Sequence, residues 1–199
     1  EPNALILETD SRPDGAQARW TSILHRFAIN ESNRLGYQSS QVLDGLVNAI
    51  SVTSERNIRV VATTLGDDFW RSHIAAYRTE GATDAWQRVW RLDLDRSPPG
   101  GTPASARFIG SRAFLAGAAT VPGTRVYNVA SATGPVLLGE LAGVGHVDDL
   151  IPLSEDRLLH APIVKPGQPW PLQIIDAADP ARSSVVGTLM FTATNGLPR

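Results

Sequence analysis

Cysteine is absent from this 199-residue chain, so disulfide bonds, cysteine-ligated zinc sites and cysteine nucleophiles are excluded. Apolar runs of the ~18–20 residues that cross a membrane as a helix are also missing, and no membrane span is expected. The 18 basic residues are balanced by 20 acidic ones, which leaves a net charge of -2 and no basic stripe for a phosphate backbone. Nucleic acid is therefore not an expected partner.

Helix signals are missing too, since no window supports a helix longer than about two turns. Short strand-like stretches recur instead, and the clearest is Trp86 to Leu94, where apolar residues alternate with polar ones. Trp86 and Trp90, four positions apart, are expected to share a face of this strand. The pattern from Phe69 to Tyr77 fits either a strand or an excursion from the sheet. With 42% hydrophobic and 19% charged residues, the sequence predicts an ordered all-β protein.

The stretch spanning residues 104–189 contains nearly the same pattern twice. Residues 112–116 (RAFLA) return as residues 157–161 (RLLHA). From Thr124 and Leu172 onward, the two copies align without a gap at an offset of 48 residues. A repeat of three to four short strands with a period of roughly 40–50 residues is typical of β-propeller blades.

We therefore expect residues 1–199 to form a single β-propeller-type domain or segment, a propeller or partial propeller of about three to four four-stranded antiparallel blades. The first unit lacks a first strand. Neighbouring blades bury their apolar faces against each other, so a blade without a neighbour would leave apolar surface exposed. The approximate units span residues 4–43, 46–94, 104–142 and 147–191.

Several phrases, in the same order along residues 20–189, resemble a family of secreted prokaryotic proteins. These proteins carry a C-terminal β-propeller domain distantly related to WD-repeat propellers. The phrases that carry the resemblance are residues 23–27, 59–64, 105–114 and 136–141. Residues 172–180 also look like a short repeat of other bacterial cell-surface propellers. The resemblance implies a propeller fold and a secreted, periplasmic or cell-surface location, but no established reaction. Family domains are usually longer than this chain, and residues 115–121 replace a more aromatic and polar segment.

A metal site is one interpretation of the start of the last unit. His146 and Asp148 are two residues apart, so they would lie on one face of a regular strand, and His160 follows in the next strand. The alternative is that adjacent acids before an apolar strand form a turn cap or a solvated bend. No cofactor is predicted, with a divalent metal ion at these three residues as the exception.

Five tryptophans are the other candidates for a functional role. In propellers such residues usually pack between blades, whereas an exposed loop tryptophan stacks on a sugar ring or anchors a protein partner. Trp170 lies between Pro169 and Pro171 and is the one expected to be exposed in a loop. Trp70 is the second candidate for ligand or partner contact.

These observations favour a non-catalytic binding or scaffolding propeller module of an exported bacterial protein, whose partner is a protein or a cell-envelope component. Two alternatives stay open. One is a propeller enzyme of the hydrolase or quinone-dependent dehydrogenase type, which would gather His and Asp residues at one mouth of a channel. The other is one piece of an obligate assembly that completes a larger propeller, with homo- or hetero-oligomers forming through open blade edges.

Overall fold

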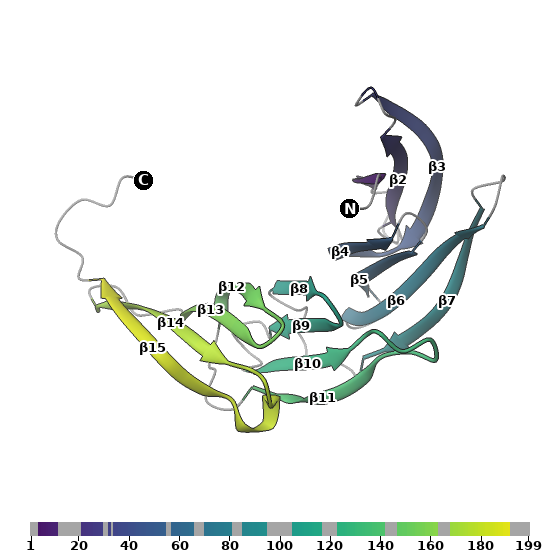
Figure 1. Ribbon diagram of the computed structural model, residues 1–199. Coiled ribbons are helices and arrows are strands. Elements are labelled where there is room, and N and C mark those ends of the chain that lie inside the picture. The colour runs from purple at the N-terminus through teal and green to yellow at the C-terminus, as the bar shows by residue number, and fades with distance from the viewer. Residues whose placement is uncertain are drawn as a thin grey trace. The chain divides into compact units, whose positions relative to one another are not determined.

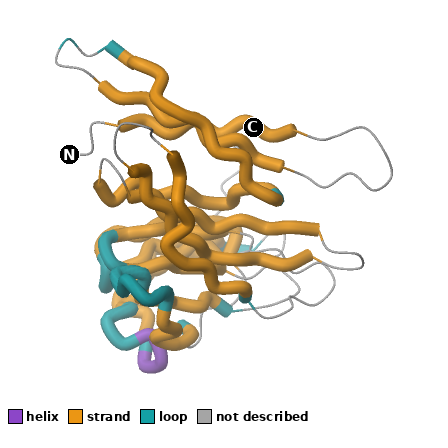
Figure 2. Tube along the Cα trace, turned by 90° about the vertical axis from the view of Figure 1, so that its right-hand side faces the viewer, coloured by secondary structure: helices purple, strands orange, loops and turns teal. Residues whose placement is uncertain are grey.

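The chain folds into fifteen described strands and one short helical turn, as the computed structural model shows (Figures 1 and 2). The structure describes residues 4–11, 21–29, 32, 34–54, 57–65, 70–80, 85–94, 105–116, 123–141, 147–162 and 168–191. The elements in chain order are β1 (Ala4–Ser11), β2 (Thr21–Ile29), β3 (Leu35–Asp44), β4 (Leu46–Ser54), β5 (Asn57–Leu65), β6 (Trp70–Glu80), β7 (Ala85–Asp93), β8 (Ser105–Ile109), β9 (Arg112–Ala116), β10 (Thr124–Asn128), β11 (Val136–Glu140), β12 (Val147–Ser154), β13 (Arg157–Pro162), β14 (Trp170–Asp176), η2 (Pro180–Arg182) and β15 (Ser184–Phe191).

Strands that follow one another in the chain pair side by side, so each sheet is an antiparallel meander. Sheet A contains β1, β2 and β3, and sheet B contains β4 to β7. Sheet C contains β8 to β11, and sheet D contains β12 to β15. The predicted all-β fold of about three to four antiparallel, blade-like sheets is confirmed, and the first sheet is the one with three strands. None of the described residues belongs to a helix long and apolar enough to cross a membrane.

The chain divides into two compact units. The first comprises Glu1–Thr102 and Ala132–Gly134, and the second comprises Pro103–Ser131 and Pro135–Arg199. In the first unit sheets A and B share one apolar core, and in the second unit sheets C and D share another. Pairwise stacking of sheets through apolar faces is how propeller blades bury their core.

In the first unit, alternation along each strand turns one face of sheet A, which includes Leu24 and Leu43, toward sheet B. The buried residues of this core are Leu24, Leu43, Ile58, Val60, Ala75 and Tyr77. Polar side chains join the two sheets as well. The Ser22 hydroxyl donates to the Gly45 carbonyl at 2.9 Å and accepts from the Val47 N–H at 3.2 Å. The Trp86 indole N–H donates to the Ser39 hydroxyl at 2.9 Å.

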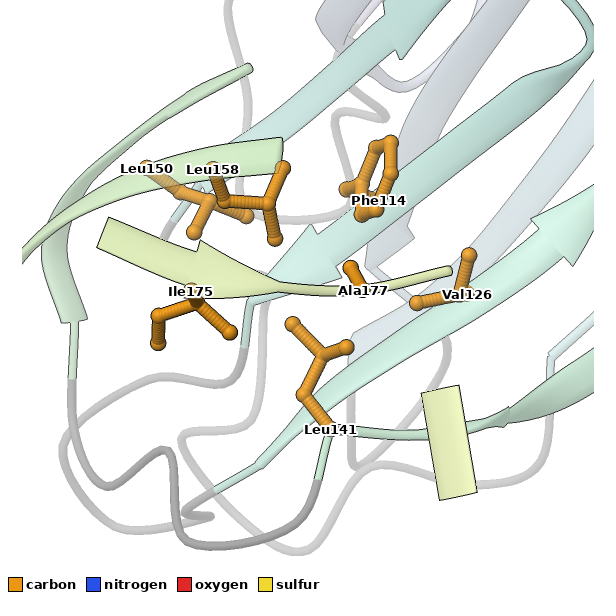
Figure 3. Packing of buried hydrophobic residues seen from close by; sticks show 7 residues of the cluster. All are labelled: Phe114, Val126, Leu141, Leu150, Leu158, Ile175 and Ala177. Carbon is orange, nitrogen blue, oxygen red and sulfur yellow. The ribbon is translucent and has the colours of Figure 1, made fainter. Parts of the chain in front are cut away.

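In the second unit, side chains of β12, β13 and β14 point toward those of β9 and β10 (Figure 3). The cluster consists of Phe114, Val126, Leu141, Leu150, Leu158, Ile175 and Ala177, each at most 2% exposed. Fully burying a side chain of this size contributes about 1.5–3 kcal/mol. This core therefore fixes which face of sheet D is turned toward sheet C.

Two sequence-based interpretations are resolved in sheet B. Residues Ser72 to Tyr77 form the middle of the regular strand β6 and are all buried, so both faces are covered and the alternation that marks a half-buried strand is missing. The prediction that Trp86 and Trp90 share a face is wrong. A bulge shifts the pairing, so that Trp86 pairs with Thr79 but Trp90 pairs with Ala76, and the two indoles lie on opposite faces.

Candidate functional site

Trp170, expected to be exposed in a loop, is instead the first residue of β14 and pairs with Phe191 of β15. Its side chain is 43% exposed, so the expected exposure is found although the loop is not. Side chains alternate between the two faces of a strand, so Trp170, Leu172 and Ile174 lie on one face of sheet D. Trp170 is thus the end of a row rather than an isolated aromatic.

The register extends this row across all four strands of sheet D. Ile174 of β14 lies between Leu159 of β13 and Gly187 of β15, and Leu159 pairs in turn with Ile151 of β12. Most of these side chains are exposed, Ile174 at 38%. We call this surface the outer face of sheet D; its apolar members are Ile151, Leu159, Trp170, Leu172, Ile174, Leu189 and Phe191.

The other face of sheet D is the one that packs in the core of the second unit. Leu150, Leu158 and Ile175 point to that side and are at most 1% exposed. Both faces carry large aliphatic side chains. They differ because one is covered in the core of the second unit and the other is exposed. A broad apolar face left exposed is typical of an interaction site.

A charged pair borders the outer face of sheet D. Arg157 of β13 forms an ion pair with Asp176 of β14 across the strand pair, with the arginine side chain 43% exposed. The backbone N–H of Ala178 holds the pKa of the Asp176 carboxyl below its usual value, and the Arg157 guanidinium lowers it further. Asp176 therefore stays ionised at neutral pH and fixes the orientation of Arg157.

Sheet A has an outer face of its own, turned away from sheet B. Leu35, Tyr37 and Val42 are exposed there, but polar residues interrupt the row. The Ser40 hydroxyl lies 2.7 Å from His25 Nδ1 and 2.7 Å from the Tyr37 hydroxyl. The outer face of sheet D is the more continuous apolar surface of the two.

Of the three residues proposed to hold a metal, only His160 has a described side chain. His160 is 2% exposed and lies on the covered face of sheet D, where its Nδ1 is 3.1 Å from Gln173 Oε1. Asp148 lies at a bulge of β12, and His146 falls outside the described residues. Within the part of the chain that the structure describes, no three His, Asp or Glu side chains form a metal-binding group. The metal site stays a prediction.

Trp70, the second tryptophan candidate, begins β6 and pairs with Leu65 of β5. Only the backbone of Trp70 is described, so its proposed contact role stays a prediction.

Sequence reasoning missed Leu189 and Phe191, although their spacing with Gly187 carries the same alternation as residues 170–174. The alternation is visible in the sequence, but only the strand register shows that β15 pairs with β14.

Comparison with known proteins identifies no family. No family model matches the chain, and no curated protein matches it. One solved structure that resembles it is described as a "putative 6-phosphogluconolactonase" from Bacteroides uniformis. The match has a TM-score of 0.42 at 7% sequence identity and covers 94% of this chain and 82% of that one.

Proposed function

We propose that this protein is a non-catalytic binding or scaffolding module of an exported bacterial protein, and that the outer face of sheet D is its contact surface for a protein partner. The observation that carries the proposal is the apolar row across four strands, with Trp170 at one end. Location outside the cytoplasm rests on the family resemblance alone.

The chemistry of the face fits a protein better than a small polar ligand. Large aliphatic side chains from four adjacent strands form a broad surface, which offers many dispersion contacts and few hydrogen bonds. Aromatic residues such as Trp170 and Phe191 supply large contact areas and often dominate the free energy of protein binding. The bordering Arg157–Asp176 pair adds charged groups at the rim, where they favour one orientation of the partner.

A hydrophobic dye tests whether this face is an accessible binding surface. Ile174→Lys places a charge in the middle of the row, at a side chain already 38% exposed, and we expect less dye fluorescence with an unchanged circular dichroism spectrum. Thr188→Lys is the matched control, because Thr188 is exposed on β15 but pairs with Gln173 and so lies on the opposite face. A folded Ile174→Lys variant that binds dye as strongly as the unchanged protein would contradict the proposal.

A further inference from the structure

We propose that the outer face of sheet D binds a further four-stranded antiparallel sheet of the same repeat, docked on sheet D as sheet D is docked on sheet C. This inference rests on the proposed function, because it names the partner for the same surface. It comes from a position-by-position correspondence between two faces, one covered and one open.

The register shows which residues of sheets C and D correspond. In sheet C, Phe114 pairs with Val126, which pairs with Gly139. In sheet D, Leu159 pairs with Ile174, which pairs with Gly187. A bulge follows the last pair of each row at the same place. Val126 and Gly139 fall on Ile174 and Gly187 at the repeat offset of 48 residues, so sequence and register give the same correspondence.

In sheet C this row is the docking surface for sheet D. Phe114 and Val126 are fully buried in the shared core. Gly139 lies under η2 of the docked sheet: a Cβ atom there would be 3.2 Å from the Ala181 nitrogen and 3.3 Å from Pro180 Cβ. The glycine is what allows the helical turn to approach the strand so closely.

An arginine completes the contact between sheets C and D. Arg112 of β9 donates to the carbonyls of Glu155, Ala177 and Ala178 at 3.0, 2.7 and 3.2 Å. It also forms an ion pair with Asp156 at 3.1 Å. All four acceptors belong to sheet D or its connecting turns. The planar guanidinium suits such a convergent set of oxygens.

Sheet D carries the corresponding residues of this surface, and there they are at least partly exposed to solvent. Ile174 is 38% exposed where Val126 is buried. A Cβ atom on Gly187 would meet only Ile174 of its own sheet, at 3.8 Å or more. Arg157, which corresponds to Arg112, has a side chain 43% exposed against 15% for Arg112. Asp176 stands where sheet C has Asn128 and orients the arginine without covering it.

The contacts that Arg112 and Gly139 of sheet C make with sheet D define what the partner of sheet D must offer. It must offer an apolar sheet face, a helical turn that fits over Gly187, and a first hairpin with an acidic residue and open carbonyls for Arg157. A second copy of this chain does not offer that hairpin in sheet D, because its Glu155 and Asp156 are already engaged by its own Arg112. The expected occupant is a further sheet of the repeat whose first hairpin is still open.

The experiment extends the chain itself. A second copy of residues 142–189 is inserted after Leu189, which falls on Leu141 at the repeat offset of 48. The added copy carries Ile174→Lys, so that its own outer face does not bind dye. We expect a folded monomer whose dye fluorescence matches that of the single-copy Ile174→Lys variant, because the original outer face is now covered.

Two substitutions in the original copy then test the details of the contact. Arg157→Ala should lower the melting temperature of the extended chain by about 3 °C or more, but that of the unextended chain by less than about 2 °C. Gly187→Leu should leave the unextended chain folded, since only ordinary contacts await it, but should restore dye binding in the extended chain.

The outcomes separate the two proposals. An added copy that stays unfolded, or that folds without lowering dye fluorescence, overturns this inference and leaves the binding face intact. Dimers of the unextended chain that lose dye fluorescence with increasing concentration would assign the face to a second copy, for instance through sheet A, and also overturn it. If the single-copy Ile174→Lys variant binds dye normally, the proposed function itself fails.

Discussion

The two pairs of stacked sheets are joined by different chemistry. Between sheets A and B, hydrogen bonds of neutral groups lie beside the core, such as that from Trp86 to Ser39, and a histidine, His73, lies buried in sheet B at 2% exposure. Between sheets C and D the contacts beside the core are charged and lie at the rim, where Arg112 and Glu155 cross from one sheet to the other. The same apolar stacking thus carries two sets of polar groups that respond differently to acid.

The difference can be stated as two lowered pKa values, each of which makes the folded state less stable as pH falls, but in different pH windows. The pKa of His73 is lowered to about 4, mainly by burial and in part by the nearby Arg91, while Asp93 partly opposes the shift. The backbone N–H of Ser111, which donates to the Glu155 carboxylate at 2.6 Å, lowers the pKa of that group. As pH falls, the first pair of sheets should lose stability below 6.5 and the second only below 4.5.

The largest effect is expected from the core of the second unit. Phe114→Ala removes a fully buried ring and should cost about 3–5 kcal/mol of unfolding free energy through lost burial and the remaining cavity. Urea denaturation followed by circular dichroism measures it. Val89→Ala, at an exposed position, should change the unfolding free energy by less than about 0.5 kcal/mol. Equal costs for the two variants would mean that sheets C and D do not share this core.

The next largest effect is the acid response of His73. The unfolded state takes up a proton near pH 6.5 and the folded state only near pH 4. Stability is therefore full above pH 6.5 and falls as pH decreases to 4, by roughly 3 kcal/mol at 1.36 kcal/mol per pKa unit. His73→Gln should remove this loss, which urea titrations at pH 7, 5.5 and 4 would detect. The same slope in both proteins would contradict the assignment.

A smaller effect is expected from the arginine between sheets C and D. Arg112→Ala leaves the carbonyls of Ala177 and Ala178 without this donor and should cost about 1–3 kcal/mol. Arg157→Ala is the matched control, since its ion pair with Asp176 is partly exposed, and should cost less than about 1 kcal/mol. Both values come from the same denaturation assay. A cost for Arg157 as large as that for Arg112 would remove the distinction between a covered and an open face.

The smallest effect is expected from Glu155. Glu155→Gln keeps the shape of the side chain but weakens acceptance from the Ser111 N–H. A lowered carboxyl pKa stabilises the folded state above the unfolded value of 4.5 and loses that contribution as pH falls below it. The melting temperature of the variant should therefore be slightly lower at pH 7 and equal to that of the unchanged protein at pH 3. Differential scanning calorimetry at the two pH values checks this, and an unchanged difference at pH 3 would contradict it.

Much of the fold could be predicted because the repeat copies whole strands with their turns. The offset that places Gly139 on Gly187 is also the offset of the register. Bulges were out of reach, since the extra residue in β7 that turns Trp90 away from Trp86 leaves no mark in an alternating sequence. Strand β6 was ambiguous because it is buried on both faces.

The candidate surface was only partly within reach of the sequence. The two prolines beside Trp170 indicated that its side chain is exposed. That Trp170 belongs to a row of apolar side chains on the outer face of sheet D depends on the pairing of β14 with β15. Arg112 and Arg157 occupy the same position of the repeat and differ only in whether a sheet lies beside them. His73 was missed because a single histidine in an apolar strand carries no signal of its surroundings.

The glycine beneath η2 has a consequence for how such a chain can change over evolutionary time. One repeat unit carries two features: the turn that covers its neighbour's glycine, and a glycine over which the next turn can lie. Both halves of the contact are therefore encoded in one segment. Tandem duplication of that segment creates a new interface without any compensating mutation, and deletion of one copy rejoins two surfaces that already fit. The length of the array can therefore drift while the joint between neighbouring units is kept.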